Sequence, residues 1–397
     1  MDYKVLGGVL LSTGMTVGAG TLSLPMMIWQ VGLPYALAWL LLFWVIMTYG
    51  SFLILEATLW LPEDANFISM TEAVLGKYAK PAIWMCCLLI IYSVLSAYIA
   101  GGGEIFWHVA HKMHISMSPA SAQILFLLVW GTVLYFGIVF VDHLNRLFVM
   151  LKFSILALLI FSLLPHISAQ GFSMGGAAII PQKFGVLGTC YAFGTIIPTL
   201  RTYYKSDLKK LRQTLWATAS IQLIIYVIWV AVIFGVLGNL GMANLKAVLL
   251  SNQPLTALMA VFNQGVKAEI VNFVMYAFIV VCIITSFLGV SAGFVDFLKD
   301  GLKLKKGLLS KLTVFLAAFV PPLFLVLFCQ TVFIKGLYYA GIGVIFLLAI
   351  FPAILVLRGR GLALSIHSKY AVPGGKIGLW SLVFIGLAVM ILGVFYG

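Results

Sequence analysis

Apolar runs long enough to cross a membrane recur along this chain from end to end. An α-helix needs about 20 apolar residues to span the hydrocarbon core of a bilayer. Of the 397 residues, 63% are hydrophobic and only 9% are charged, whereas a soluble domain carries about 25% charged residues. No loop is long enough to hold a soluble domain. The sequence therefore predicts an all-α polytopic membrane protein, with a single transmembrane domain over residues 1–397.

The apolar runs and the breakers between them predict eleven spans. Ser69 to Glu72 form a capping-box pattern, which predicts a short helix at the membrane surface within residues 61–80. Residues 239–265, divided by Pro254, are expected to form two short helices over the outer mouth of the transmembrane domain. The spans are expected at residues 5–30, 33–60, 82–110, 119–139, 144–165, 184–204, 213–238, 267–298, 311–329, 332–357 and 377–396.

The distribution of positive charge predicts the orientation. Cytoplasmic loops of membrane proteins carry an excess of Lys and Arg, so we expect a cytoplasmic amino terminus and an outer carboxyl terminus. The first run has only Lys4 and Asp2 before it and is expected to be a retained helix, not a cleaved signal peptide. The net charge of +13 then reflects topology and contact with anionic lipid, not nucleic acid. Only five of the 24 Lys and Arg residues would lie outside, namely Lys112, Lys183, Lys246, Lys267 and Lys335.

The first span contains helix-breaking residues in its middle. Residues 14–25 contain Gly18, Ala19 and Gly20 and end in Pro25; Gly is a poor helix former and Pro lacks a backbone donor. A helix broken at this depth exposes N–H and C=O groups, which are costly in hydrocarbon unless protein, water or a ligand pairs them. We therefore expect a broken helix with a ligand site. The alternative is a kink or close helix packing.

The sixth span carries a second interruption. Residues 191–198 contain Gly194 and Pro198, which predict a break at a similar depth. Broken helices in corresponding positions of two halves are typical of transporters built from inverted repeats. The first and sixth positions predict two five-helix repeats, at about 5–165 and 184–357, followed by an eleventh helix at about 377–396.

Several motifs together resemble the hydroxy/aromatic amino acid permeases of the amino acid–polyamine–organocation superfamily, and in particular their tyrosine-specific branch. The resemblance implies a leucine-transporter-like fold with an added eleventh helix. It also implies proton-driven import of an aromatic amino acid, with tyrosine favoured, across the bacterial inner membrane by alternating access. It is carried by Gly18-Ala19-Gly20 with Pro25, Asp142-His143-Leu144-Asn145-Arg146, Phe193-Gly194, and Thr285-Ser286-Phe287-Leu288-Gly289-Val290.

An amino acid offers a carboxylate and an ammonium group, and both can be recognised by helix ends. The free N–H groups of a half-helix attract an anion, so Ala19, Gly20 and Thr21 are expected to hold the carboxylate. Carbonyls beside the two breaks are expected to accept from the ammonium. These carbonyls are expected near Thr16 and Val17 in the first span and near Tyr191, Ala192 and Phe193 in the sixth, and Gly18 at the first break is counted among the substrate-binding residues.

The substrate side chain needs an apolar pocket with few polar groups. In the third span Tyr92 and Ser96 are four residues apart and share a helix face. In the sixth span Phe193 beside Gly194 could stack on an aromatic ligand, and Thr195 could add a hydroxyl. Because 14% of the chain is aromatic, the alternative for each aromatic residue is ordinary packing.

Lys152 lies within the fifth span, where an ammonium group is costly. Some proton-coupled members of the superfamily place a lysine where sodium-coupled relatives bind an ion, against carbonyls of the first span and hydroxyls of the eighth. Thr285 and Ser286 would be its partners in the eighth span. The alternative is a lysine that reaches the inner surface along its aliphatic chain. Glu104 is a further candidate for proton coupling or gating. Glu56 and Asp296 are weaker ones, because both lie near a predicted inner interface.

No pattern predicts catalysis, a cofactor or a metal centre. His108, His111 and His114 are more typical of a polar edge at the interface than of a metal site, and the five cysteines have no disulfide or zinc spacing. A sodium-coupled or broader neutral amino acid transporter on the same fold is the alternative function. A channel or receptor is a remote alternative, because two broken helices five spans apart argue against both.

Overall fold

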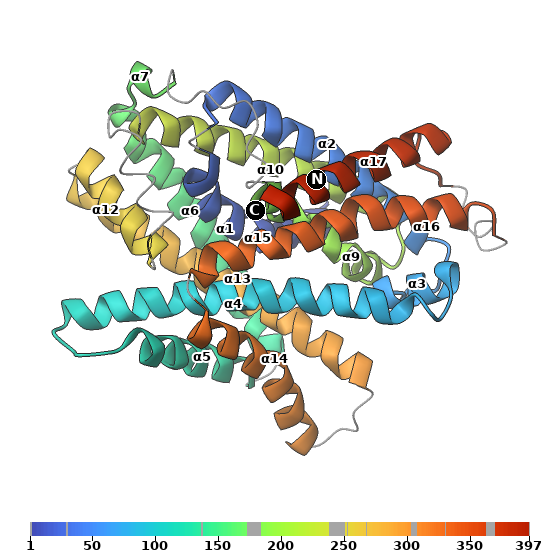
Figure 1. Ribbon diagram of the computed structural model, residues 1–397, viewed down its shortest axis with the longest axis horizontal. Coiled ribbons are helices and arrows are strands. Elements are labelled where there is room, and N and C mark those ends of the chain that lie inside the picture. The colour runs from blue at the N-terminus through green and yellow to red at the C-terminus, as the bar shows by residue number, and fades with distance from the viewer. Residues whose placement is uncertain are drawn as a thin grey trace.

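The computed structural model describes residues 2–28, 31–135, 138–172, 184–237, 251, 253–266, 268–302, 308–329, 331–362 and 370–396. Within these ranges the regular structure is entirely helical (Figure 1). Eight of the described helices are long and apolar enough to cross a membrane. Two shorter apolar helices and one interrupted helix complete the eleven predicted spans, whose positions are confirmed.

The uninterrupted helices lie within a few residues of the predicted spans. The tenth span is one continuous rod in which the π-helical segment η4 (Phe346–Ile350) separates α15 (Val332–Ile345) from α16 (Phe351–Gly359). The others are α1 (Tyr3–Ile28), α2 (Leu33–Thr58), α4 (Lys80–Lys112), α5 (Pro119–Tyr135), α6 (Ile138–Leu163), α10 (Leu208–Leu237), α13 (Glu269–Leu302), α14 (Leu308–Phe328) and α17 (Gly375–Tyr396).

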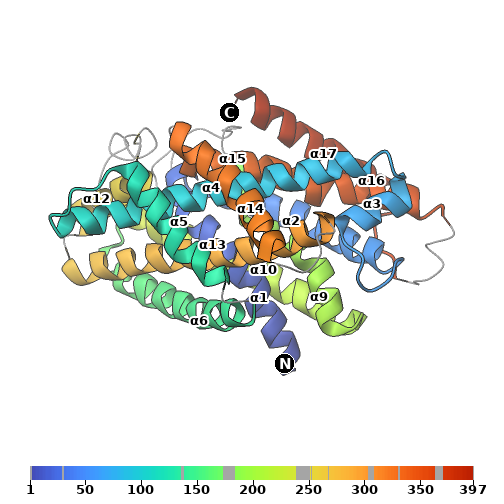
Figure 2. The same ribbon diagram turned by 90° about the horizontal axis from the view of Figure 1, so that it is seen from below.

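Short helices lie at the two ends of the molecule. α4 runs along the long axis, with α3 (Phe67–Leu75) near its first residues and α12 (Pro254–Val266) at the opposite end (Figures 1 and 2). The predicted inner and outer loops therefore lie on opposite sides. η1 (Leu164–His166) and α7 (Ala169–Phe172) follow α6, and α7 lies at the same end of the molecule as α12. The other short helix predicted within residues 239–265 falls outside the described residues.

The short helix α3 is confirmed, but its predicted capping box is wrong. The side chain of Asn66 accepts hydrogen bonds from the N–H groups of Ile68 and Ser69, and Ser69 Oγ accepts one from the N–H of Asn66. The helix therefore starts three residues earlier than the pattern from Ser69 to Glu72 indicated. Asn caps a helix as well as Ser does, and this start places Met70 on the buried face.

The predicted break in the first span is wrong, because α1 is a continuous helix through residues 14–25. Pro25 removes the N–H that would pair with the carbonyl of Thr21. The indole Nε1 of Trp229, on α10, donates to that carbonyl at 2.7 Å instead. A partner on another helix therefore satisfies the backbone group that Pro25 leaves open.

The glycines of α1 serve close packing instead of a break. A Cβ atom built at Gly18 would overlap Ser286 Oγ of α13, and one at Gly20 would overlap the Tyr226 hydroxyl of α10. The alternative reading of this segment, tight packing of small residues, is the one that the structure adopts.

The predicted break in the sixth span is confirmed. α8 (Phe184–Cys190) ends before Tyr191, which has φ −110° and ψ 33°, and the 3₁₀ segment η3 (Ala192–Ile196) follows. α9 (Ile197–Tyr204) then resumes with Pro198 in its first turn, where a missing N–H costs nothing.

Two contacts fix the rod of α15 and η4 to its neighbours without any side chain in between. A Cβ atom built at Gly341 would overlap the carbonyl oxygen of Gly185 on α8, and one at Gly50 of α2 would overlap the carbonyl oxygen of Leu348 in η4. Glycine allows this approach because it has no Cβ. The first half of the interrupted helix and α2 are thus packed backbone to backbone against one rod.

Candidate functional site

The hydroxyl of Tyr226 lies where α1 and the interrupted helix meet. It is 3.1 Å from the carbonyl oxygen of Thr16 and 3.0 Å from that of Cys190, the last residue of α8. Its side chain is completely buried. Two backbone acceptors from the two spans that sequence singled out therefore converge on one donor.

Buried polar atoms without partners surround this point. Gln222 Nε2 donates to Thr16 Oγ1, but Gln222 Oε1 has no hydrogen-bond partner among the described residues, and neither does the hydroxyl of Tyr191. The rings of Tyr191 and Tyr226 meet edge to face at 5.6 Å. Buried polar groups are rarely left unpaired, so this cluster has both hydrogen-bonding capacity and aromatic surface to offer a ligand.

The predicted substrate residues of α1 other than Ala19 are buried, but they face different helices, since Gly18 lies against Ser286 of α13 and Gly20 against Tyr226 of α10. Thr21 Oγ1 donates to the carbonyl of Val17 at 2.5 Å, and the side chain of Ala19 lies outside the described residues. In the sixth span Phe193 is buried, while Thr195 Oγ1 donates to the carbonyl of Ala192 at 2.7 Å. The hydroxyls of both threonines are thus used within their own helices.

Tyr92 and Ser96 point elsewhere, toward α14. The hydroxyl of Tyr92 donates to the carbonyl of Ala317 at 2.7 Å, and Ser96 Oγ lies 3.2 Å from the carbonyl of Pro322. Pro321 removes the helical N–H that would serve Ala317. The two hydroxyls therefore connect α4 to a proline-weakened stretch of α14.

Lys152 joins three helices. Its Nζ donates to the carbonyl of Gly14 on α1 at 2.6 Å and lies 3.4 Å from Thr285 Oγ1 on α13. With 0% of its surface exposed, the side chain does not reach the inner surface, so the alternative of a lysine extending to the interface does not describe this structure. Thr285 donates its own proton to the carbonyl of Val281, which leaves its oxygen free to accept from Lys152. Ser286 lies against Gly18 instead.

Glu104 connects α4 to the outer helix α12. Its carboxylate is buried and accepts a hydrogen bond from the N–H of Thr256 at 2.5 Å, in the first turn of α12. A helix amino terminus stabilises an anion, and the described residues supply no ion-pair partner for Glu104. A cavity of about 250 Å³ lies beside it, lined in part by Trp107, Gln123 and Gln253.

The carboxylate of Glu56 forms an ion pair with Arg360. Glu56 is buried, and its two oxygens accept from Nε and Nη2 of Arg360, each at 2.8 Å. This pairing raises the pKa of Arg360 and indicates a structural role for Glu56. Asp296 belongs to α13, and its side chain lies outside the described residues.

Sequence reasoning overlooked two groups. The sequence places Arg201 among the inner positive charges, yet its guanidinium is buried and donates to the carbonyls of Thr58, Leu61 and Pro62 at the end of α2 and just after it. Tyr226 and Gln222 lie in a span without helix breakers. A polar residue in mid-span, such as Gln222, was the available signal.

Comparison with known proteins assigns the family. The model of the tryptophan/tyrosine permease family matches residues 1–393. The chain belongs to this family. Among its family relatives, tyrosine-specific transport system 1 of Haemophilus influenzae is 27% identical over 97% of this chain and 95% of its own length. Glutamine transporter 2 of Aliivibrio fischeri is also 27% identical, over 98% and 99%.

The fold agrees with solved transporters. The crystal structure of MhsT in complex with L-phenylalanine superposes with a TM-score of 0.62 at 15% identity, and the match covers 98% of each chain. The family member described here thus has the leucine-transporter-like fold that the sequence predicted. It is a multi-pass membrane protein of an aromatic amino acid transporter family, whose relatives are named as transport proteins.

Proposed function

We propose that this chain imports an aromatic amino acid, with tyrosine favoured, across the bacterial inner membrane by proton symport and alternating access. The observation that carries the proposal is Lys152, a fully buried lysine that bonds α1 and α13 from α6. The inverted repeats at about 5–165 and 184–357 are part of this proposal, because alternating access is generally a movement of one repeat against the other.

Proton coupling follows from the position of Lys152. A charged ammonium binds the carbonyl of Gly14 strongly, since hydrogen bonds to charged groups are about twice as strong as neutral ones. Loss of the proton weakens this bond and removes a buried charge. The two protonation states therefore favour different packings of α1, α6 and α13, which is what a coupled transporter requires.

The proposed substrate site lies at Tyr226, between residues 16–21 of α1 and residues 191–195. Once the phenol of Tyr226 moves aside, the carbonyls of Thr16 and Cys190 can accept from the ammonium group of the substrate. The unpaired hydroxyl of Tyr191 and Oε1 of Gln222 can bind further polar groups, and the ring of Phe193 can contact an aromatic side chain. In the same proposal Glu104 holds the outer helix α12 and releases it when protonated.

A broader or sodium-coupled neutral amino acid transporter is the second candidate. The observation that favours breadth is the similarity to a protein named as a glutamine transporter. Backbone carbonyls recognise the ammonium group, which all amino acid substrates share. Selectivity among these substrates then depends on the pocket for the substrate side chain.

Uptake into proteoliposomes tests the proposal. Labelled tyrosine, tryptophan, phenylalanine and glutamine are supplied with an inward proton gradient, and separately with a sodium gradient. We expect accumulation of tyrosine with the proton gradient alone, loss of that dependence in Lys152→Gln, and normal uptake in the exposed control Lys77→Gln. Accumulation that needs sodium, or unchanged proton dependence in Lys152→Gln, would contradict proton symport.

Glu104 is tested separately from Lys152. The amide in Glu104→Gln can still accept from the N–H of Thr256, so α12 should stay in place. Outward opening is measured by the accessibility of a cysteine introduced in α12. We expect this accessibility to lose its pH dependence in Glu104→Gln. Unaltered pH dependence would remove Glu104 from the coupling mechanism.

A further inference from the structure

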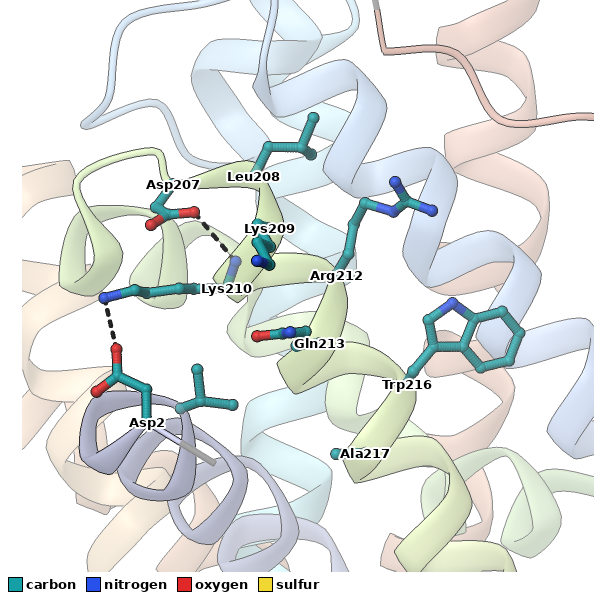
Figure 3. Close-up of a pocket in the computed structure, with 10 residues that line it drawn as sticks. Asp2, Asp207, Leu208, Lys209, Lys210, Arg212, Gln213, Trp216 and Ala217 are labelled. Atoms are coloured by element: carbon teal, nitrogen blue, oxygen red, sulfur yellow. Dashed lines mark hydrogen bonds and ion pairs between the residues drawn. The ribbon is translucent and has the colours of Figure 1, made fainter.

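A broad groove of about 1010 Å³ lies between the start of α1 and the first turns of α10, at the end predicted to face the cytoplasm (Figure 3). It is lined by Asp2 and Val5 from one side and by Asp207, Lys209, Arg212 and Trp216 from the other. This groove is separate from the proposed substrate site, and transport as proposed above makes no use of it.

Both carboxylates of the groove are already engaged. Asp2 Oδ2 pairs with Nζ of Lys210 at 2.7 Å, which lowers the pKa of Asp2. Asp207 Oδ1 accepts from the N–H of Lys210 at 3.1 Å and so caps α10. Lys209 has no anionic partner among the described residues, and neither does Arg212, whose guanidinium lies 5.6 Å from the ring of Tyr370. Figure 3 shows Lys210 pointing to Asp2, away from Arg212. Two cations are left for an external anion.

The groove continues into an apolar stripe. Arg212, Trp216, Ile224 and Ile228 are all exposed and lie on one ridge of α10 at spacings of four or eight residues, with the exposed Ser220 between Trp216 and Ile224. Such a ridge winds slowly around the helix, inclined about 26° to its axis. The indole of Trp216 lies beside the rings of Trp44 and Phe52, with centroids 6.4 and 5.1 Å away. Tryptophan is typical of the membrane–water interface. An oblique apolar stripe therefore leads away from the charged end.

We propose that this groove binds an anionic phospholipid. Its phosphate lies between Lys209 and Arg212, where the guanidinium can donate two parallel hydrogen bonds, and its acyl chains run along Trp216, Ile224 and Ile228. Basic pockets between helices on the cytoplasmic side bind anionic headgroups in this way. A soluble phosphate would use the two cations but would leave the stripe unused, so the stripe selects a lipid.

Native mass spectrometry of the purified full chain, with dioleoyl phosphatidylglycerol and dioleoyl phosphatidylcholine supplied together, tests the proposal. We expect phosphatidylglycerol to be retained at least tenfold over phosphatidylcholine. Lys209→Gln/Arg212→Gln should lose this preference at least tenfold. The charge-matched control Lys77→Gln/Lys112→Gln, at exposed positions elsewhere, should keep it, and so should the charge-conserving Lys209→Arg/Arg212→Lys.

Two further arms separate a lipid from a soluble anion. Glycerol 3-phosphate at millimolar concentration should not displace the bound phosphatidylglycerol, whereas Trp216→Ala should weaken its retention. Displacement by glycerol 3-phosphate, or equal retention by the double glutamine variant and its control, would overturn the proposal. The assay measures binding without transport, so its failure is distinguishable from failure of the transport proposal.

Discussion

Replacing Gly18 by Ala tests whether α1 is continuous. A Cβ at this position would overlap Ser286 Oγ and would lie 3.3 Å from the carbonyl oxygen of Cys282 and 3.6 Å from Ser286 Cβ. The hydroxyl of Ser286 is thus the one severe obstacle. Overpacking of this kind costs about 1–3 kcal/mol, and Ala in place of Gly in a helix gains about 0.5–1 kcal/mol.

The two terms predict a coupling between Gly18 and Ser286 in a double-mutant cycle. Gly18→Ala alone should lower the free energy of unfolding by about 1–2 kcal/mol, since the overlap outweighs the helix gain. In the background of Ser286→Ala the same change should lower the free energy of unfolding by at least about 0.5 kcal/mol less, because the overlap with the hydroxyl is gone and only the tight 3.3 Å approach to the carbonyl oxygen of Cys282 remains. Residues in direct contact couple by about 0.5–3 kcal/mol, which is the range expected here.

Chemical unfolding in mild detergent measures all four members of the cycle. The control is Gly293→Ala in α13, where a Cβ meets nothing within 4 Å and only the helix gain should register. If Gly18→Ala is equally destabilising with and without Ser286→Ala, the helix is not continuous against α13 at this point, and the reasoning fails.

Three other substitutions test contacts away from α1. Arg360→Gln should lower the free energy of unfolding by about 3–5 kcal/mol because Glu56 is left as an unpaired buried charge; adding Glu56→Gln should restore most of the loss, and a double variant no better than the single one would contradict the pairing. Tyr92→Phe should lower the free energy of unfolding by about 1–3 kcal/mol, because the buried carbonyl of Ala317 loses its donor. A change below about 0.5 kcal/mol, as is usual at surface positions, would show that this carbonyl has another partner. Arg201→Lys should cost a similar amount, since one ammonium cannot reproduce a guanidinium that serves three carbonyls, and unchanged unfolding would refute this clamp.

The sequence was sufficient for the positions of the spans and for one of the two breaks. Apolar length is a local property, and so is the combination of Gly194 and Pro198 in adjacent turns. The outcome at Pro25 depends instead on Trp229, which is some 200 residues away and satisfies the carbonyl of Thr21. No local pattern contains that information.

The same dependence on contacts between distant residues explains which parts of the candidate site could be predicted from the sequence. Lys152 was recognisable because a charge within an apolar run is rare, and its partners Gly14 and Thr285 lie on helices that the family resemblance had indicated. Tyr226 is one tyrosine among 16; Gln222, one turn earlier, marks the neighbourhood as polar, but the sequence does not show that this tyrosine faces α1 and α8. Tyr92 and Ser96 share a helix face as expected, but the identity of the helix they face depends on the packing of α14.

The contact of Gly341 with Gly185 restricts how this protein can move. Two backbones that touch directly have no side-chain rotamers with which to adjust, so sliding of α15 past α8 would require the helices to separate. The same holds for Gly50 of α2 against η4. We expect α2, α8 and the rod of α15 and η4 to move as one body, so that in the proposed alternating access the change of shape would fall on the break at Tyr191 and the short helix α9 beyond it.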